Sequence, residues 1–158
     1  MSGNSMMNNI TIENATREDF EMMQMMFRRM FDIFSEDQDV EYPYKENGER
    51  YLKERIEQGI ALVAKLDNSC IGFLTGSIEK ALDFKVYDKY GFIHNMFVSE
   101  EYREMGIGKR LVEAFVNKCK ARGIQYVQAD SDANQSLINF YTGNGFKVCG
   151  VSYKMKLS

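Results

Sequence analysis

The sequence predicts an α+β fold, in which a mixed, mostly antiparallel β-sheet of six to seven strands is flanked by about four helices. Length and composition support one domain, because 158 residues with 44% hydrophobic content can bury a continuous core. The order of the patterns supports the mixed sheet, since hairpin-like runs come first and strands alternating with helices follow. We therefore expect a single domain over residues 1–158, with residues 1–9 forming a disordered end.

The first half of the chain predicts a strand, two helices, a hairpin and a further strand. Thr16 and Asp19 form the capping-box pattern that begins a helix, and Gly59 is placed to end the next one. The acidic stretch 35–44 between these helices has the composition of a loop. In order, the predicted elements are a strand at 10–12, helices at 20–34 and 46–58, hairpin strands at 60–66 and 70–78, and a strand at 92–98.

In the second half, helical and strand patterns alternate, which is typical of a β-α-β unit. Gly123 ends the first of these helices, and Ser131 or Asp132 is expected to cap the second. The predicted elements are a helix at 107–121, a strand at 124–129, a helix at 133–142, and strands at 146–148 and 152–157.

Composition excludes several classes of partner. A net charge of −3 and a pI near 5.3 give no basic surplus for nucleic acid or an anionic membrane surface. No apolar run approaches the roughly 20 residues of a membrane span, and the N-terminus lacks the order of a signal peptide, so we expect a cytoplasmic protein.

The three cysteines, Cys70, Cys119 and Cys149, are spaced for neither a metal site nor a disulfide framework. Buried free thiols and no metal are therefore expected.

A glycine-bearing turn, Arg103 to Lys109, connects the strand at 92–98 to the helix that begins at Ile107. Such a turn gathers backbone N–H groups at the positive end of the helix dipole, which suits a phosphate. It is not a mononucleotide P-loop, because Arg103 and Arg110 stand where that motif needs glycine and Ser or Thr. It is not a dinucleotide fingerprint either, because Leu111 replaces the third glycine.

The pattern Arg-x-x-Gly-x-Gly between a strand and a helix resembles the acetyl-CoA signature of the GNAT superfamily of N-acetyltransferases. A second segment at the expected distance supports the resemblance, with Asn134, the run 137–141 and Asn144-Gly145-Phe146. The resemblance covers residues 60–157. It departs modestly from the family pattern, since Glu104 stands where glycine is most frequent and Leu137 where alanine is frequent.

The resemblance implies how acetyl-CoA is bound. The sheet splays into a V between the fourth and fifth strands, where the pantetheine arm pairs with Val98 and the Met96 N–H faces the thioester oxygen. The turn cradles the pyrophosphate, and Asn134 either binds the pantetheine arm or caps a helix. The residues assigned to acetyl-CoA are Met96, Phe97, Val98, Arg103, Glu104, Met105, Gly106, Ile107, Gly108, Lys109 and Asn134.

The resemblance also assigns catalytic roles. Tyr141 matches the residue that donates toward the departing sulfur. Full proton transfer from a phenol with pKa ~10 to a thiolate near ~8.5 is uphill by roughly 2 kcal/mol, so a stabilising hydrogen bond is the expected role. The amine must lose a proton before it attacks. His94 is the candidate base, on the same strand face as Met96 unless a bulge intervenes, and Glu79 or a water held by Asn95 are the alternatives.

The predicted function is acetyl transfer to a primary amine of a small, cationic acceptor in a ternary complex. Tyr42 and Tyr44, which lie among acidic residues, and Glu79 are the expected acceptor-binding residues. Two alternatives remain: an acetyl-CoA-binding regulator without turnover, and a protein N-acetyltransferase for lysine or N-terminal amines. The additional methionines of the first helix fit a pocket wall or a homodimer face, so both a monomer and a homodimer remain open.

Overall fold

The structure is a computed structural model that describes residues 7–34 and 47–158. Its strands form one five-stranded sheet in the order β1-β2-β3-β4-β5, in which the first four strands are antiparallel and β5 runs parallel to β4. The strands are β1 (Ile10–Asn14), β2 (Ile60–Leu66), β3 (Ser69–Lys80), β4 (Lys89–Val98) and β5 (Val127–Ala129). The α-helices are α2 (Phe20–Phe34), α3 (Glu49–Gln58), α4 (Ile107–Ala121) and α5 (Gln135–Gly143), and the short 3-10 helices are η1 (Arg17–Asp19) and η3 (Glu100–Tyr102).

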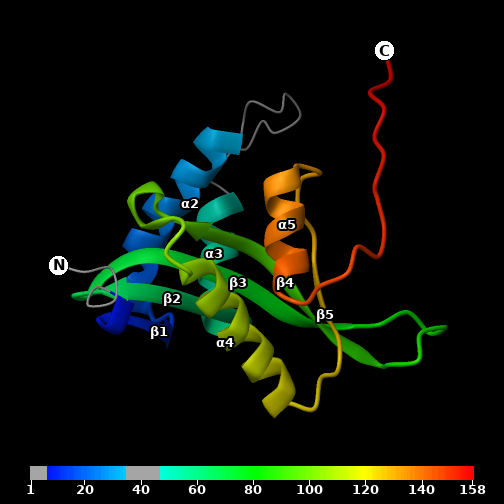
Figure 1. Ribbon diagram of the computed structural model, residues 1–158, viewed down its shortest axis with the longest axis horizontal. Coiled ribbons are helices and arrows are strands. Elements are labelled where there is room, and N and C mark those ends of the chain that lie inside the picture. The colour runs from blue at the N-terminus through cyan, green and yellow to red at the C-terminus, as the bar shows by residue number, and fades with distance from the viewer. Residues whose placement is uncertain (1–6, 35–46) are drawn as a thin grey trace.

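Helices cover both faces of the sheet, with α2 and α3 on one face and α4 on the other (Figure 1). Each face therefore has its own buried cluster. On the α4 face, Leu111 and Phe115 pack against β-strand residues such as Leu74. On the opposite face, Phe27 of α2 and Leu52 of α3 pack on the sheet. This layered arrangement confirms the predicted fold class.

Two glycines let α4 lie close to the centre of the sheet. A Cβ atom built on Gly76 would overlap the ring of Phe115, and one on Gly91 would come within 2.5 Å of the Cys119 sulfur. Because glycine has no side chain, the helix packs directly on the strand backbone at these two positions. The position of α4 matters for function, since its N-terminus carries the predicted phosphate turn.

The structure confirms the predicted capping box but corrects the predicted N-cap of α5. The Thr16 N–H donates to Asp19 at 2.8 Å, and this box begins η1, which leads into α2. The cap of α5 is Asn134 instead of Ser131 or Asp132, because its side-chain oxygen accepts the Leu137 N–H at 2.9 Å. The position three residues before Leu137 is the one from which a side chain reaches that donor.

The sheet has five strands instead of six to seven, because the C-terminal segment adds none. Residues 146–148 and 152–157, both predicted strands, pair with no strand in the described chain, and the segment runs away from the body in Figure 1. An alternating pattern shows that a segment could form a strand, but a strand also requires a partner edge. Consequently Cys149 is exposed, contrary to prediction, whereas Cys70 and Cys119 are buried free thiols as expected.

Candidate active site

A β-bulge in β4 determines which side chains meet at the centre of the site. Thr75 of β3 is opposite Asn95, but the next residue, Gly76, is opposite Ile93, so His94 is the additional residue of the bulge. The extra residue turns His94 and Asn95 to the face covered by α2 and α3. Met96 packs with the α4 cluster on the other face. The bulge therefore separates His94 from Met96, which an unbroken strand would have kept on one face.

His94 belongs to a short polar chain on β3 and β4. The Ser77 hydroxyl donates to Glu79 at 2.5 Å, and its oxygen lies 2.7 Å from His94 Nε2. Because the single hydroxyl proton is directed to the carboxylate, His94 Nε2 is the donor in the second contact. Nδ1 of the neutral ring then keeps its lone pair and can accept a proton.

The surroundings of His94 hold the ring neutral. Burial lowers the pKa of His94 below its ordinary value of 6.5, and the charge of Arg55 lowers it further. Glu79, whose carboxylate oxygen is 3.8 Å from Nε2, and Asp130 act in the opposite direction without reversing the shift. A neutral imidazole at pH 7 is the form that a general base requires.

A second polar cluster joins α3 to the two central strands. The Tyr51 hydroxyl donates to Asn95 Oδ1 at 2.7 Å, and the buried Thr75 hydroxyl donates to the same oxygen at 3.3 Å. These bonds fix the Asn95 amide beside His94. Sequence reasoning named Asn95 but missed Tyr51 and Thr75. Tyr51 lies within the helix predicted at 46–58, and its position along that helix does not show that it faces Asn95. The strand pattern does not fix where a bulge would align Thr75 with Asn95.

The glycine turn has the geometry of an anion site. Gly106 has φ +80° immediately before α4, and Glu104 also has positive φ, at 64°. This explains why glycine suits position 104 as well, since a left-handed backbone is strained for a residue with a Cβ. The first turn of α4, which begins at Ile107, contains no acidic residue, so its N–H groups and the helix dipole meet no carboxylate there.

The two basic side chains of the turn have partners within the chain. Arg103 Nε donates to the Val98 carbonyl at 2.9 Å, and its guanidinium lies 5.2 Å from the centre of the Phe97 ring. Lys109 Nζ lies 3.9 Å from Glu113 Oε1 on the exposed side of α4. Arg103 thus braces the turn against the end of β4 and occupies the Val98 carbonyl that was expected to pair with the pantetheine arm.

The outer edge of β4 is open beside this turn. Pairing with β5 covers only Gly91–Ile93, so the two strands diverge beyond Ile93. The Ser99 N–H donates to Ile71 on β3 at 2.9 Å. Because backbone groups alternate along a strand, those of Val98 and Met96 point away from β3, toward the open edge. This divergence is the splay predicted between the fourth and fifth strands.

Helix α5 places Tyr141 near the same edge. A Cβ on Gly108 would lie 3.3 Å from the Phe140 ring and 3.7 Å from the end of Met96, so α4, α5 and β4 meet at this glycine. Tyr141 packs between Phe140 and Phe146, with ring centroids 5.1 and 5.3 Å away. Burial raises the pKa of Tyr141, which keeps its hydroxyl protonated at neutral pH.

Two of the expected acceptor-binding residues, Tyr42 and Tyr44, lie outside the described residues. Glu79, the third, is on β3 in the chain that leads through Ser77 to His94. Within residues 7–34 and 47–158, no group of three or more His, Cys, Asp or Glu side chains could hold a metal ion. Over the same residues, no helix is long and apolar enough to cross a membrane.

Comparison with known families decides the assignment, because residues 27–146 match the acetyltransferase (GNAT) family. The chain belongs to the GNAT acetyltransferase family. The matched span includes both polar clusters of the site, the glycine turn, Asn134 and Tyr141. Membership identifies the chain as an acetyltransferase, as the sequence motifs predicted.

Solved structures with low sequence identity share the GNAT fold. A tetramutant of protein BH1408 from Bacillus halodurans is 16% identical with a TM-score of 0.81, over 93% of this chain and 99% of that one. Aminoglycoside N-acetyltransferase AAC(6')-Iy in complex with CoA is 15% identical with a TM-score of 0.77, over 94% of each chain. A predicted acetyltransferase from Clostridium acetobutylicum with acetyl-CoA is 16% identical with a TM-score of 0.75, over 93% of this chain and 96% of that one. No curated protein sequence matches the chain.

Proposed function

We propose that this GNAT protein transfers an acetyl group from acetyl-CoA to the primary amine of a small, cationic acceptor, by direct attack within a ternary complex. The proposal depends mainly on one observation, which is that three groups lie together at the open edge of β4. These are the Met96 backbone, the N-terminus of α4 and Tyr141. Two structural neighbours crystallised with CoA or acetyl-CoA support the choice of donor.

The donor is held by backbone groups. Residues 103–109 cradle the pyrophosphate, because the α4 N-terminus presents unpaired N–H groups and no acidic side chain. The pantetheine arm lies along the open edge, where Asn134 contributes its amide NH2 while its oxygen caps α5. The Met96 N–H stabilises the negative charge that forms on the thioester oxygen.

The reaction forms a C–N bond and breaks a C–S bond. The amine nitrogen attacks the thioester carbon, the resulting oxyanion collapses, and CoA leaves as a thiolate. Tyr141 stabilises that thiolate by a hydrogen bond, since burial has raised the pKa of the phenol and made full proton transfer still more costly. The sulfur then takes a proton from solvent, and the proton lost by the amine passes to a base.

His94 is the proposed base. The neutral ring keeps a lone pair on Nδ1, and its Nε2–H is held by Ser77 and Glu79. An ordinary amine with pKa ~10 is neutral in only about one molecule per thousand at pH 7, so a group that accepts its proton is required. Asn95 lies next to His94 and, oriented by Tyr51, can position the amine or a water between them.

A cationic acceptor is supported by the acidic composition of residues 36–41 in sequence, beside Tyr42 and Tyr44. Acidic groups near a cleft raise the local concentration of a cation. Structural neighbours that are aminoglycoside acetyltransferases, among them one in complex with sisomicin, agree with a small amine acceptor.

Thiol release from acetyl-CoA, measured across a panel of amines, tests this function. We expect turnover with at least one small amine, and we expect Tyr141→Phe to lower kcat by about tenfold to hundredfold with little change in KM, because a hydrogen bond to the leaving group is lost. Val151→Ala, at an exposed position, serves as the matched control. Binding of acetyl-CoA without thiol release from any amine would identify a regulator instead, and activity confined to peptide substrates would identify a protein N-acetyltransferase.

A further inference from the structure

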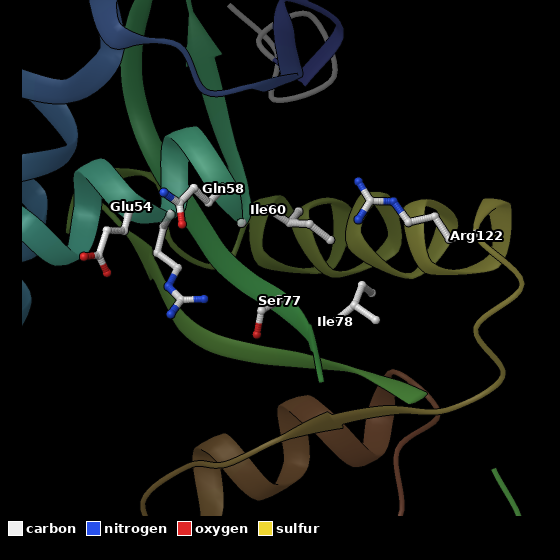
Figure 2. Close-up of a pocket in the computed structure, with 8 residues that line it drawn as sticks. Glu54, Gln58, Ile60, Ser77, Ile78 and Arg122 are labelled. Atoms are coloured by element: carbon white, nitrogen blue, oxygen red, sulfur yellow. The ribbon is translucent and has the colours of Figure 1, made fainter. Parts of the chain in front are cut away.

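A cavity of about 270 Å³ lies between the C-terminal ends of α3 and α4, where β2 begins. Figure 2 shows Glu54 and Gln58 on α3 at one side, Arg122 reaching in from the end of α4 at the other, and Ser77 of β3 below them. Arg55 also lines the cavity. The lining thus combines two guanidinium groups with one carboxylate, so positive charge prevails.

Arg55 carries the clearest sign of an anion-binding site. Its Nε is buried and has no hydrogen-bond partner. The guanidinium lies over the Tyr51 ring at 5.2 Å, so ring stacking holds it in place without using its N–H donors. Neither Arg55 nor Arg122 forms an ion pair with the described part of the chain. A buried donor without a partner is costly, and an anionic acceptor group would satisfy it.

The cavity is connected to the reaction site through Ser77. This side chain lines the cavity, and its hydroxyl oxygen lies 2.7 Å from His94 Nε2. The positive charge of Arg55 also acts on His94, because it adds to the lowering of the His94 pKa that burial causes. A ligand bound at Arg55 can therefore extend past Ser77 toward His94 and Asn95.

We propose that the cavity binds a carboxylate of the acceptor between Arg55 and Arg122, so that the acceptor is an amino-acid-like molecule carrying both a carboxylate and the reacting amine. The planar guanidinium of Arg55 matches the two oxygens of a carboxylate, and Gln58 and Ser77 offer further polar groups. The proposal rests on the proposed acetyl transfer to a small amine and narrows its substrate class.

The kinetic test compares lysine with 1,5-diaminopentane, which differ only by the carboxylate. We expect the wild-type kcat/KM to favour lysine about tenfold or more, the scale of one charged hydrogen-bonded contact. Arg55→Gln should raise KM for lysine by a similar factor relative to KM for 1,5-diaminopentane, and Arg122→Gln should act in the same direction. Because Arg55 also lowers the pKa of His94, Arg55→Gln can change kcat, but that change should be common to both amines and cancel in the ratio of their kcat/KM values. The control Arg17→Gln alters an exposed ion pair with Glu57 and should keep the preference. An unchanged ratio of kcat/KM for the two amines in Arg55→Gln, or no wild-type preference for lysine, would overturn the proposal.

A binding test separates this site from turnover. Glutarate, a dicarboxylate without an amine, should raise the Tm of the wild type and of Arg17→Gln, and neutral glutaramide should not. Arg55→Gln should lose the shift. If the shift is present but no amine is acetylated, the carboxylate site stands and the proposed function fails. If wild type and Arg55→Gln respond alike to glutarate, the site fails even where acetyl transfer is observed.

Discussion

At the scale of single residues, His94 shows how a polar chain and burial together define a protonation state. Ser77 can receive the His94 Nε2–H because its own proton is directed to Glu79. Burial and Arg55 then disfavour the charged ring. The Glu79 carboxylate acts against this shift without reversing it, and its charge is partly screened because the side chain is partly exposed to solvent. The result is a neutral ring with Nδ1 available at neutral pH.

The lowered pKa of His94 predicts how stability depends on pH. The unfolded ring binds a proton below about pH 6.5, whereas the folded ring resists protonation, so the unfolded state binds more protons in that window. The free energy of unfolding should therefore fall as the pH drops below the unfolded pKa and through the folded one. Urea unfolding at about pH 7.5 and about pH 5.5 measures this.

The matched variant for that measurement is His94→Gln, which keeps a side-chain N–H for Ser77 and has no titrating group. We expect its stability to depend less on pH than that of the wild type over the same interval. Parallel pH profiles for the two proteins would show that His94 does not titrate with a lowered pKa.

At the scale of elements, the N-terminus of α4 depends on a backbone that only glycine adopts without strain. Gly106→Ala should destabilise the fold by about 1 kcal/mol, because φ +80° brings a Cβ too close to the carbonyl oxygen. It should also weaken acetyl-CoA binding, since any relaxation of the turn moves the N–H groups that hold the pyrophosphate. Calorimetric titration with acetyl-CoA and urea unfolding measure the two effects.

Gly123→Ala provides the control at the other end of the same helix. Gly123 has φ +74°, and nothing lies within 4 Å of where its Cβ would be, so the backbone cost should be similar. It lies far from the turn, and acetyl-CoA affinity should not change. Equal losses of affinity in both variants would mean that the effect reflects general stability and not the phosphate turn.

At the scale of the whole molecule, the C-terminal segment exposes a row of apolar side chains and adds no strand to the described sheet. Val151, Tyr153, Met155 and Leu157 alternate with polar residues and are 63–92% exposed. A segment with an alternating pattern that belongs to no sheet can add a strand to another sheet edge. We expect the full chain to self-associate with rising concentration and a chain ending at Phe146 to do so less. Sedimentation velocity measures this, and concentration-independent monomers in both cases would contradict it.

The sequence by itself determined the features that depend on local chemistry. These are the fold class, the position of the glycine turn before α4, and the family, since motif spacing and periodicity are local properties of the chain. Positive φ at Gly106 and the capping box at Thr16 follow from neighbouring residues alone. The roles given to Asn134 and Tyr141 came from the same local motifs and remain predictions.

Only the tertiary structure decided which side chains meet across the sheet. The sequence left open whether a bulge separates His94 from Met96, and only the register of β3 against β4 places the bulge at His94. Tyr51, Thr75 and Asn95 form one cluster because that register aligns them under α3. The tertiary structure also decided that the Arg55 Nε–H is buried without an acceptor and that the C-terminal segment joins no sheet. Both features depend on which groups lie nearby in space.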